Sequence, residues 1–121
     1  MAWDVEFTDQ FEEWWGEIDA DAQADIDAAV RLLAEFGPTL GRPHVDTVNG
    51  SRHANMKELI VQSNGRPFRT FFAFDPRRTA ILLIGGDKTG QKRFYEETIP
   101  IADRLYDEHL RAIQKEDAHD G

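Results

Sequence analysis

The chain opens with alternating apolar and acidic residues. Trp3, Val5 and Phe7 alternate with Asp4 and Glu6, which is the period of a half-buried β-strand. We therefore expect this stretch to form a short strand with one face against the core.

The next apolar residues recur at helical spacing. Phe11, Trp14, Trp15 and Ile18 follow Thr8, whose hydroxyl can cap a helix N-terminus. The two tryptophans are adjacent, so both are not expected to point into one core. Two interpretations stay open: one tryptophan faces an interface, or it is simply an exposed aromatic residue.

A second helix is predicted from about Asp19 to Phe36. Its apolar stripe is Ile26, Ala29, Val30 and Leu33, with Phe36 as a further candidate. Asp19 and Asp21 lie at its start, where the helix dipole favours acidic residues, and Gly37-Pro38 ends it. The two helices would form an αα-hairpin.

Residues 37–51 hold three Gly and two Pro and are predicted to be a loop. Three strand-like runs follow it: Asn55–Gln62, Phe68–Phe74 and Thr79–Ile84. The intervening turns, Ser63–Gly65 and Asp75–Arg78, are short, so the runs should form an antiparallel meander. Residues 80–84 are apolar on both faces, which predicts a sheet covered on both sides.

The last element is a helix. Thr98 is its expected N-cap and Pro100 lies in its first turn, with Ile101, Leu105 and Ile113 at helical spacing. Residues 115–121 are polar, and we expect them to fray. The predicted fold is a single α+β domain over residues 1–121 in the order β-α-α-β-β-β-α, with the αα-hairpin on one face of an antiparallel sheet and the C-terminal helix partly shielding a basic second face.

Composition narrows the classes of protein. The chain has 121 residues and no cysteine, which suits one core and excludes disulfides, thiolate metal sites and cysteine nucleophiles. No apolar run approaches the roughly 20 residues that span a bilayer, and the N-terminus has no signal-peptide pattern. We expect a cytoplasmic protein with no membrane partner.

The charge is distributed unevenly. The chain carries a formal charge of −9, yet residues 52–93 contain nine basic and three acidic residues, a charge of +6. The acidic remainder can be a solvated surface, but local potential decides what a surface attracts. An anionic ligand is therefore expected on the strand-rich segment.

Four residues of this segment are candidates for a site. Lys57, Arg69 and Lys88 lie in or just after three consecutive predicted strands, and Tyr95 follows seven residues after Lys88. Adjacent strands are only about 4.8 Å apart, so these cations could converge on a phosphodiester. The alternative is that they are solvated strand-end residues and that the tyrosine belongs to the core.

A metal centre is not expected. His44, Asp46 and His53 match no compact metal motif. The Gly85–Gly90 stretch lacks phosphate-loop spacing, so no cofactor is predicted.

Several short motifs together resemble one family. These are Met56–Leu59, Phe68–Phe72 and Gly86–Lys88 with Tyr95, in the predicted order of elements. They resemble the RelE/ParE superfamily of bacterial toxins over roughly residues 3–113. The chain also resembles the HigB-type, phage-derived branch of this superfamily at Gly41–Asp46, Gly50–His53, Asp75–Arg78 and Ile99–Ala102.

The resemblance implies a type II toxin that cleaves mRNA in the ribosomal A site without a metal, the RNA 2′-hydroxyl attacking the adjacent phosphate. It implies that Lys57 assists the base or stabilises charge and that Arg69 holds the charge developing on the phosphate. Lys88 would protonate or neutralise the leaving oxygen, and Tyr95 would stack on a base or assist proton transfer. Some branches have histidines at the site, whereas here only His53 is near in sequence. Lysine's usual pKa near 10.4 makes Lys57 a poor base unless its neighbours depress it.

Further cations are expected to contact RNA. They are Arg52, His53, Arg66, Arg77, Arg78, Lys92 and Arg93. The resemblance also implies a cognate helix-turn-helix antitoxin as partner, besides mRNA on the ribosome. Two alternatives stay open: a ParE-like toxin that inhibits gyrase without cutting RNA, and a non-catalytic interaction module.

Overall fold

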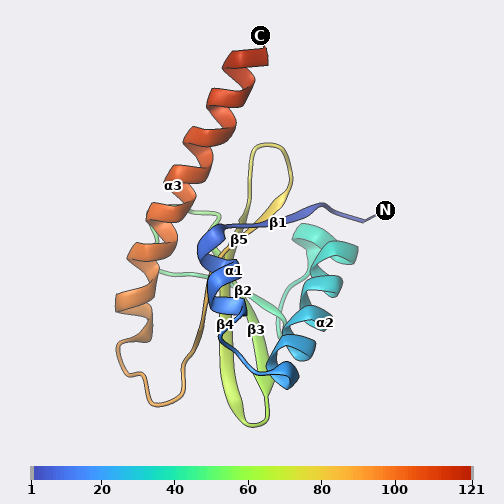
Figure 1. Cartoon of the computed structure of the whole chain (residues 1–121), viewed down its shortest axis with the longest axis vertical. Helices are drawn as coiled ribbons and strands as arrows, with labels where there is room; N and C mark the ends of the chain where they lie inside the picture. Colours follow the sequence, from blue (N-terminus) through green and yellow to red (C-terminus); the bar gives the residue numbers. More distant parts are fainter. Residues whose placement is uncertain (1, 121) are drawn as a thin grey trace.

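The computed structural model describes residues 2–120, with the side chains of residues 117–120 left aside. Its centre is a five-stranded sheet in the order β1-β5-β4-β3-β2. The strands are β1 (Val5–Phe7), β2 (Val45–Thr47), β3 (Lys57–Ser63), β4 (Arg66–Phe74) and β5 (Ala80–Asp87). The helices are α1 (Asp9–Trp15), α2 (Ala20–Phe36), the 3₁₀ turn η1 (Gly37–Thr39) and α3 (Phe94–Asp120). The α+β class and the sheet covered on both faces are confirmed (Figure 1).

Local signals set the ends of the αα-hairpin as predicted. Thr8 caps α1 by accepting a hydrogen bond from the Phe11 amide at 3.0 Å, and Asp19 caps α2 through the Ala22 amide at 2.8 Å. Gly37 ends α2 at a φ of 59°, a backbone conformation that glycine adopts without strain.

The pairing of the sheet differs from the prediction at both edges. β1 pairs with β5 in parallel, so the sheet is mixed rather than antiparallel throughout. β2 lies inside the predicted loop, where Val45 is buried opposite Leu59. A three-residue strand carries too little alternation to be recognised, and its pairing with β3 decides its conformation.

Two separate cores lie on the two faces of the sheet. Phe68 and Phe72 of β4 pack with α1 and α2, whereas Phe71 and Ala73 pack with α3. This follows from the period of two along a strand. The pairing of β4 with β5 shifts by one residue between Phe71 and Phe72, so Leu83 of β5 is an extra residue without a partner in β4.

The predicted start of the last helix is wrong. α3 begins at Phe94, four residues before Thr98, so Pro100 lies inside the helix. Phe94 is buried against the α3-side core, and this packing outweighs the local cap signal and the backbone hydrogen bond that Pro100 cannot donate. The helix includes residues 115–120; the expected fraying there stays a prediction, and residue 121 lies outside the described residues. In residues 2–120 no helix is long and apolar enough to cross a membrane.

Candidate functional site

The candidate site lies on the α3 side of the sheet. β3 contributes Glu58, β4 contributes Arg69, and Tyr95 comes from the first turn of α3. Lys88 follows directly after β5. The meander and the start of α3 therefore bring together Glu58, Arg69, Lys88 and Tyr95, which we call the Glu58 cluster.

Glu58 is at the centre of this cluster. Its Oε1 accepts a hydrogen bond from the Tyr95 hydroxyl at 2.7 Å and lies 3.1 Å from Arg69 Nε. The Glu58 and Arg69 side chains are only 9% and 13% exposed. A buried carboxylate requires such partners, because an unpaired buried charge is costly.

Lys88 and Tyr95 complete the arrangement. Lys88 Nζ donates to the Tyr95 hydroxyl at 3.3 Å and lies 4.9 Å from the centre of the tyrosine ring. That ring also stacks on Phe71, at 6.1 Å between centroids. Tyr95 is therefore held by its ring and by its hydroxyl, and it links the cation to the carboxylate.

The tyrosine is a hydrogen-bond donor at neutral pH. Burial, followed by the hydrogen bond to Glu58 and its negative charge, raises the pKa of Tyr95 to about 12. A phenol with this pKa stays protonated near pH 7, so Tyr95 does not serve as a proton acceptor there. Its hydroxyl orients the Glu58 carboxylate instead.

Arg69 retains capacity for an anion. Its Nη1 donates to the Phe68 carbonyl at 2.9 Å. Among the described residues, no acceptor is aligned with its buried Nε for a hydrogen bond, although Glu58 is close enough for an ion pair. Buried donors without an aligned acceptor are uncommon and often mark functional sites.

Lys57 does not join the cluster, so the expected convergence of all three cations is wrong. Its Nζ donates to Thr47 Oγ1 at 3.2 Å at the sheet edge. Lys57 precedes Glu58 in β3 and pairs with Phe72, whose side chain faces the αα-hairpin core. Successive strand residues point to opposite faces, which places Lys57 on the other side of the sheet.

The sequence reasoning missed Glu58. It is one of only three acidic residues within the basic segment, and it directly precedes the apolar run 59–61 of β3 at a position that faces α3. That combination predicts a buried, paired carboxylate. The signal was in the sequence, but the choice of face required the register of β3 and β4.

The predicted RNA-binding cations do not form one basic face. Arg52 pairs with Asp107, as does His53 at 2.8 Å from its Nε2, and Arg77 pairs with Asp75 at 2.7 Å and Glu6 at 2.8 Å. Arg77 and Arg78 lie in the β4–β5 turn, at the opposite end of β5 from Lys88 (Figure 1). Acidic residues of the folded chain thus neutralise much of the charge that the sequence segregates.

The other predicted cations lie nearer the cluster or the sheet end that carries it. Arg66 pairs with Asp19 at 2.5 Å and lies over the Phe68 ring, and Arg93 pairs with Glu96 at 2.9 Å. Lys92 is exposed in the β5–α3 loop. Arg66 lies two residues before Phe68 on the same face of β4, the face of the αα-hairpin. Lys92 and Arg93, between Lys88 and Tyr95, are therefore the predicted cations that lie close to the Glu58 cluster along the chain.

His53 is engaged with Asp107, and within residues 2–116 no three His, Asp or Glu side chains are grouped to hold a metal ion.

Comparison with known structures defines the class of fold. The isolated Escherichia coli RelE toxin superposes with a TM-score of 0.59 over 83% of this chain and 99% of its own, at 10% identity. The toxin–antitoxin complex RelBE2 of Mycobacterium tuberculosis gives a TM-score of 0.51 over 72% of this chain and 99% of the matched chain, at 12% identity. The chain therefore has the RelE-type fold.

Sequence comparison gives the family. Residues 13–107 match the family described as Phage derived protein Gp49-like, and the chain belongs to this family. It is 53% identical over 96 residues to a Mycobacterium tuberculosis protein named "Putative toxin HigB3", covering 78% of this chain and 82% of that protein. It is 47% identical over 103 residues to "Putative toxin HigB2" of the same organism, covering 84% of this chain but about half, 51%, of that protein. The expected resemblance to the RelE/ParE superfamily and its HigB-type branch is confirmed.

Proposed function

We propose that this chain is the toxin of a toxin–antitoxin system and acts as a metal-independent endoribonuclease on mRNA at the ribosome. Its family and its relatives named as toxins support the first part. One observation carries the second: a carboxylate, a guanidinium and an ammonium group lie around one tyrosine hydroxyl.

Three groups of the Glu58 cluster act directly on the RNA, and Tyr95 orients the Glu58 carboxylate. Glu58 accepts the proton of the RNA 2′-hydroxyl as its oxygen attacks the adjacent phosphorus. Arg69 stabilises the negative charge that develops on the phosphoryl oxygens, because a guanidinium binds them in a fixed fork. Lys88 gives a proton to the leaving 5′ oxygen. The products are a 2′,3′-cyclic phosphate and a 5′-hydroxyl end.

The Glu58–Arg69 ion pair sets the order of events. An incoming phosphate would compete with Glu58 for the guanidinium, and Glu58 would then turn towards the 2′-hydroxyl. Glu58 thus takes the role of the base, which the resemblance implied that Lys57 would assist. We propose for Lys57 an electrostatic contact with the RNA backbone from outside the cluster.

The proposed partner is an antitoxin of the helix-turn-helix class, encoded beside the toxin gene. The solved RelBE2 assembly is named a toxin–antitoxin complex, and the family membership of this chain supports a comparable arrangement. Translation takes place in the cytoplasm, so we propose that compartment as its location.

The test is primer extension on a reporter mRNA after brief induction of the chain in cells. The expected result is new 5′ ends within the translated region for the wild type and their loss in Glu58→Gln. The general-base contribution typically amounts to about 10²–10⁴-fold. Glu108→Gln, an exposed change on α3, is the matched control and should cleave like the wild type.

Two results would contradict the proposal. Intact transcripts together with damaged DNA would favour a gyrase inhibitor, and harmless expression would favour an interaction module. Elemental analysis of the purified, active protein for bound metal tests the metal independence, because the ribosome itself needs Mg²⁺ and a chelator in excess would dissociate it.

A further inference from the structure

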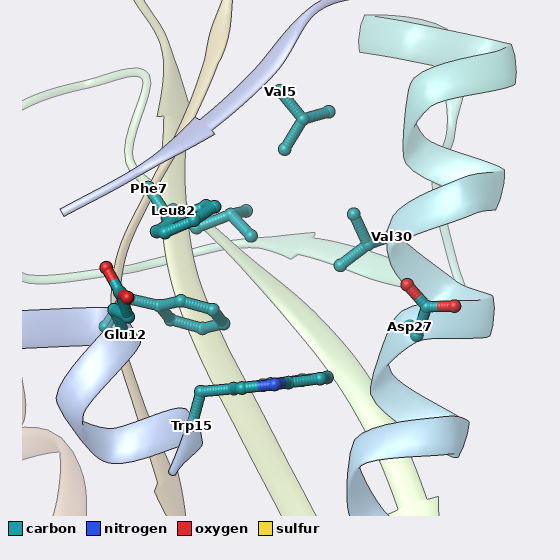
Figure 2. Close-up of a pocket in the computed structure, with 8 residues that line it drawn as sticks. Val5, Phe7, Glu12, Trp15, Asp27, Val30 and Leu82 are labelled. Atoms are coloured by element: carbon teal, nitrogen blue, oxygen red, sulfur yellow. The ribbon is translucent and has the colours of Figure 1, made fainter. Parts of the chain in front are cut away.

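A hollow lies on the face of the molecule opposite the Glu58 cluster, between β1, α1 and α2. Its volume is about 430 Å³. The apolar lining consists of Val5, Phe7, Phe11, Trp15, Val30 and Leu82, with the carboxylates Glu12 and Asp27 beside them (Figure 2). We call this the hairpin groove.

The groove exposes aromatic surface. Phe7 is 55% exposed, the largest exposed fraction among the big apolar residues of the described chain. Trp15 is half-buried and lies across the hollow from Val30 (Figure 2). Both tryptophans of the pair pack on the hairpin-side core, which corrects the expectation that only one could do so, yet Trp15 still presents part of its ring to the groove. Aromatic side chains around a hollow are typical of pockets that receive an apolar anchor from a partner.

The surroundings of the groove are strongly acidic. The first 36 residues contain eleven acidic residues and one basic residue, a formal charge of −10. The one basic residue, Arg31, pairs with Asp27 at 3.0 Å on the surface, where both side chains are at least half exposed. Such pairs contribute little and exchange easily. Complementarity therefore requires a basic partner.

One wall of the groove is an edge strand. β1 is the terminal strand of the sheet and has β5 as its sheet neighbour, so in the described chain its other edge has backbone groups without a strand partner. Another strand can pair with such an edge. A small apolar ligand would leave these groups unused, whereas a polypeptide can pair with them while a side chain enters the hollow.

We propose that the hairpin groove binds a segment of a partner protein that is rich in Lys or Arg and inserts a large apolar side chain between Phe7, Trp15 and Val30. The site lies on the other face of the sheet from the Glu58 cluster, so this proposal does not rest on the proposed nuclease activity.

The test uses the full chain and three short synthetic peptides of equal length. The first contains Phe and Leu among Lys residues, the second replaces Phe and Leu by Ser, and the third replaces Lys by Glu. Isothermal titration calorimetry and backbone NMR shifts measure binding. The first peptide should bind and shift Phe7, Trp15 and Val30, and the other two should bind at least about tenfold more weakly.

Charge reversal in the chain locates the site. Asp27→Lys and Glu12→Lys change side chains on the surface, so folding should be preserved, and each should weaken the first peptide about tenfold. Asp25→Lys makes the same charge change on an exposed position of α2 outside the groove and should alter binding by less than about twofold. Cleavage of mRNA by all three variants should equal that of the wild type, which separates this test from that of the nuclease.

Four outcomes would overturn the proposal. Equal binding of the Ser-substituted peptide would reduce it to unspecific charge attraction, and equal binding of the Glu peptide would remove the need for a basic partner. No binding of any peptide would exclude a polypeptide site of this chemistry. Self-association of the wild type that Asp27→Lys abolishes would identify the occupant as a second copy of the chain.

Discussion

Both faces of the sheet carry an apolar core, but their polar groups are organised differently. On the α3 face, Glu58 and Arg69 are buried and form an ion pair, and Glu58 also accepts a hydrogen bond from the Tyr95 hydroxyl. On the hairpin face, Glu12 and Asp27 stand on the surface around a hollow. Buried, mutually oriented charges suit catalysis. Exposed charges around an apolar hollow suit recognition.

The comparison predicts its largest effect at Arg69. Arg69→Ala should lower mRNA cleavage by about 10²–10³-fold, because it removes the group that stabilises transition-state charge. It should also destabilise the fold by about 3 kcal/mol, since Glu58 then remains buried without its cation. Quantitative cleavage assays and urea denaturation measure the two losses.

Two variants separate these losses. Arg69→Lys keeps the positive charge, so the free energy of unfolding should stay close to that of the wild type. It loses the fork geometry of the guanidinium, so the cleavage rate should still fall. Arg104→Ala, at an exposed position of α3, should change neither. Full activity in Arg69→Lys would show that charge alone suffices.

The adjacent glycines of β5 allow the two faces to be disturbed one at a time. A Cβ at Gly86 would lie 2.6 Å from the Phe94 ring, next to Tyr95, whereas a Cβ at Gly85 would lie 2.3 Å from Trp14 of α1. Each alanine variant should lose about 1–3 kcal/mol through overpacking. Only Gly86→Ala should also lower the cleavage rate per folded molecule.

Melting curves and cleavage rates measured on the same samples check this difference. Gly41→Ala is the control, because a Cβ there meets no atom within 4 Å. Equal loss of specific activity in Gly85→Ala would show that the two faces are coupled through β5.

Asp75 ties α3 to the β4–β5 turn. Its Oδ2 lies 2.8 Å from His109 Nε2 and 2.7 Å from Arg77 Nη2, and its side chain is fully buried. Burial alone would raise the pKa of this carboxyl, but hydrogen bonds from Arg77, His109 and Thr79 outweigh it, so the pKa lies below its usual value. Asp75→Asn should therefore cost about 1–3 kcal/mol at pH 7.

This stability has a defined pH dependence. A folded-state pKa below the unfolded one means that the ionised carboxylate stabilises the fold above the unfolded value near 3.9 and that this contribution is lost as the pH falls further. The difference in unfolding free energy between wild type and Asp75→Asn should thus shrink below about pH 4. An unchanged difference at pH 3 would contradict the role given to the ionised form, and Asp25→Asn, at an exposed residue, serves as control.

The smallest effect is expected at Lys57. Because its ammonium group lies on the face opposite Glu58 and bonds to Thr47, Lys57→Ala should reduce cleavage by less than about tenfold, as the loss of one phosphate contact would. Lys88→Ala is the comparison variant and should cost more. Equal losses of cleavage by Lys57→Ala at 50 mM and at higher salt would argue against a purely electrostatic contact. A loss of cleavage as large as that of Arg69→Ala would show that Lys57 belongs to the catalytic residues.

Much of the fold was predictable because its signals are local. The caps at Thr8 and Asp19, the stop at Gly37 and the meander of β3 to β5 each depend on residues close in sequence. The short strand β2, the parallel pairing of β1 and the start of α3 at Phe94 were missed. Each of them is stabilised by contacts with distant residues that outweigh a weak or misleading local preference.

The sequence by itself determined the α+β class, the two covered faces, and the residue types that a phosphodiester site needs. Only the tertiary structure decided which of those residues meet. The register of β3 against β4 turns Glu58 rather than Lys57 towards Arg69 and Tyr95, since one residue along a strand reverses the face of every side chain. Charge counted along the chain likewise gave no information on pairing. Asp75 reaches His109, and Asp103 and Asp107 reach Arg52, only when α3 docks on the sheet.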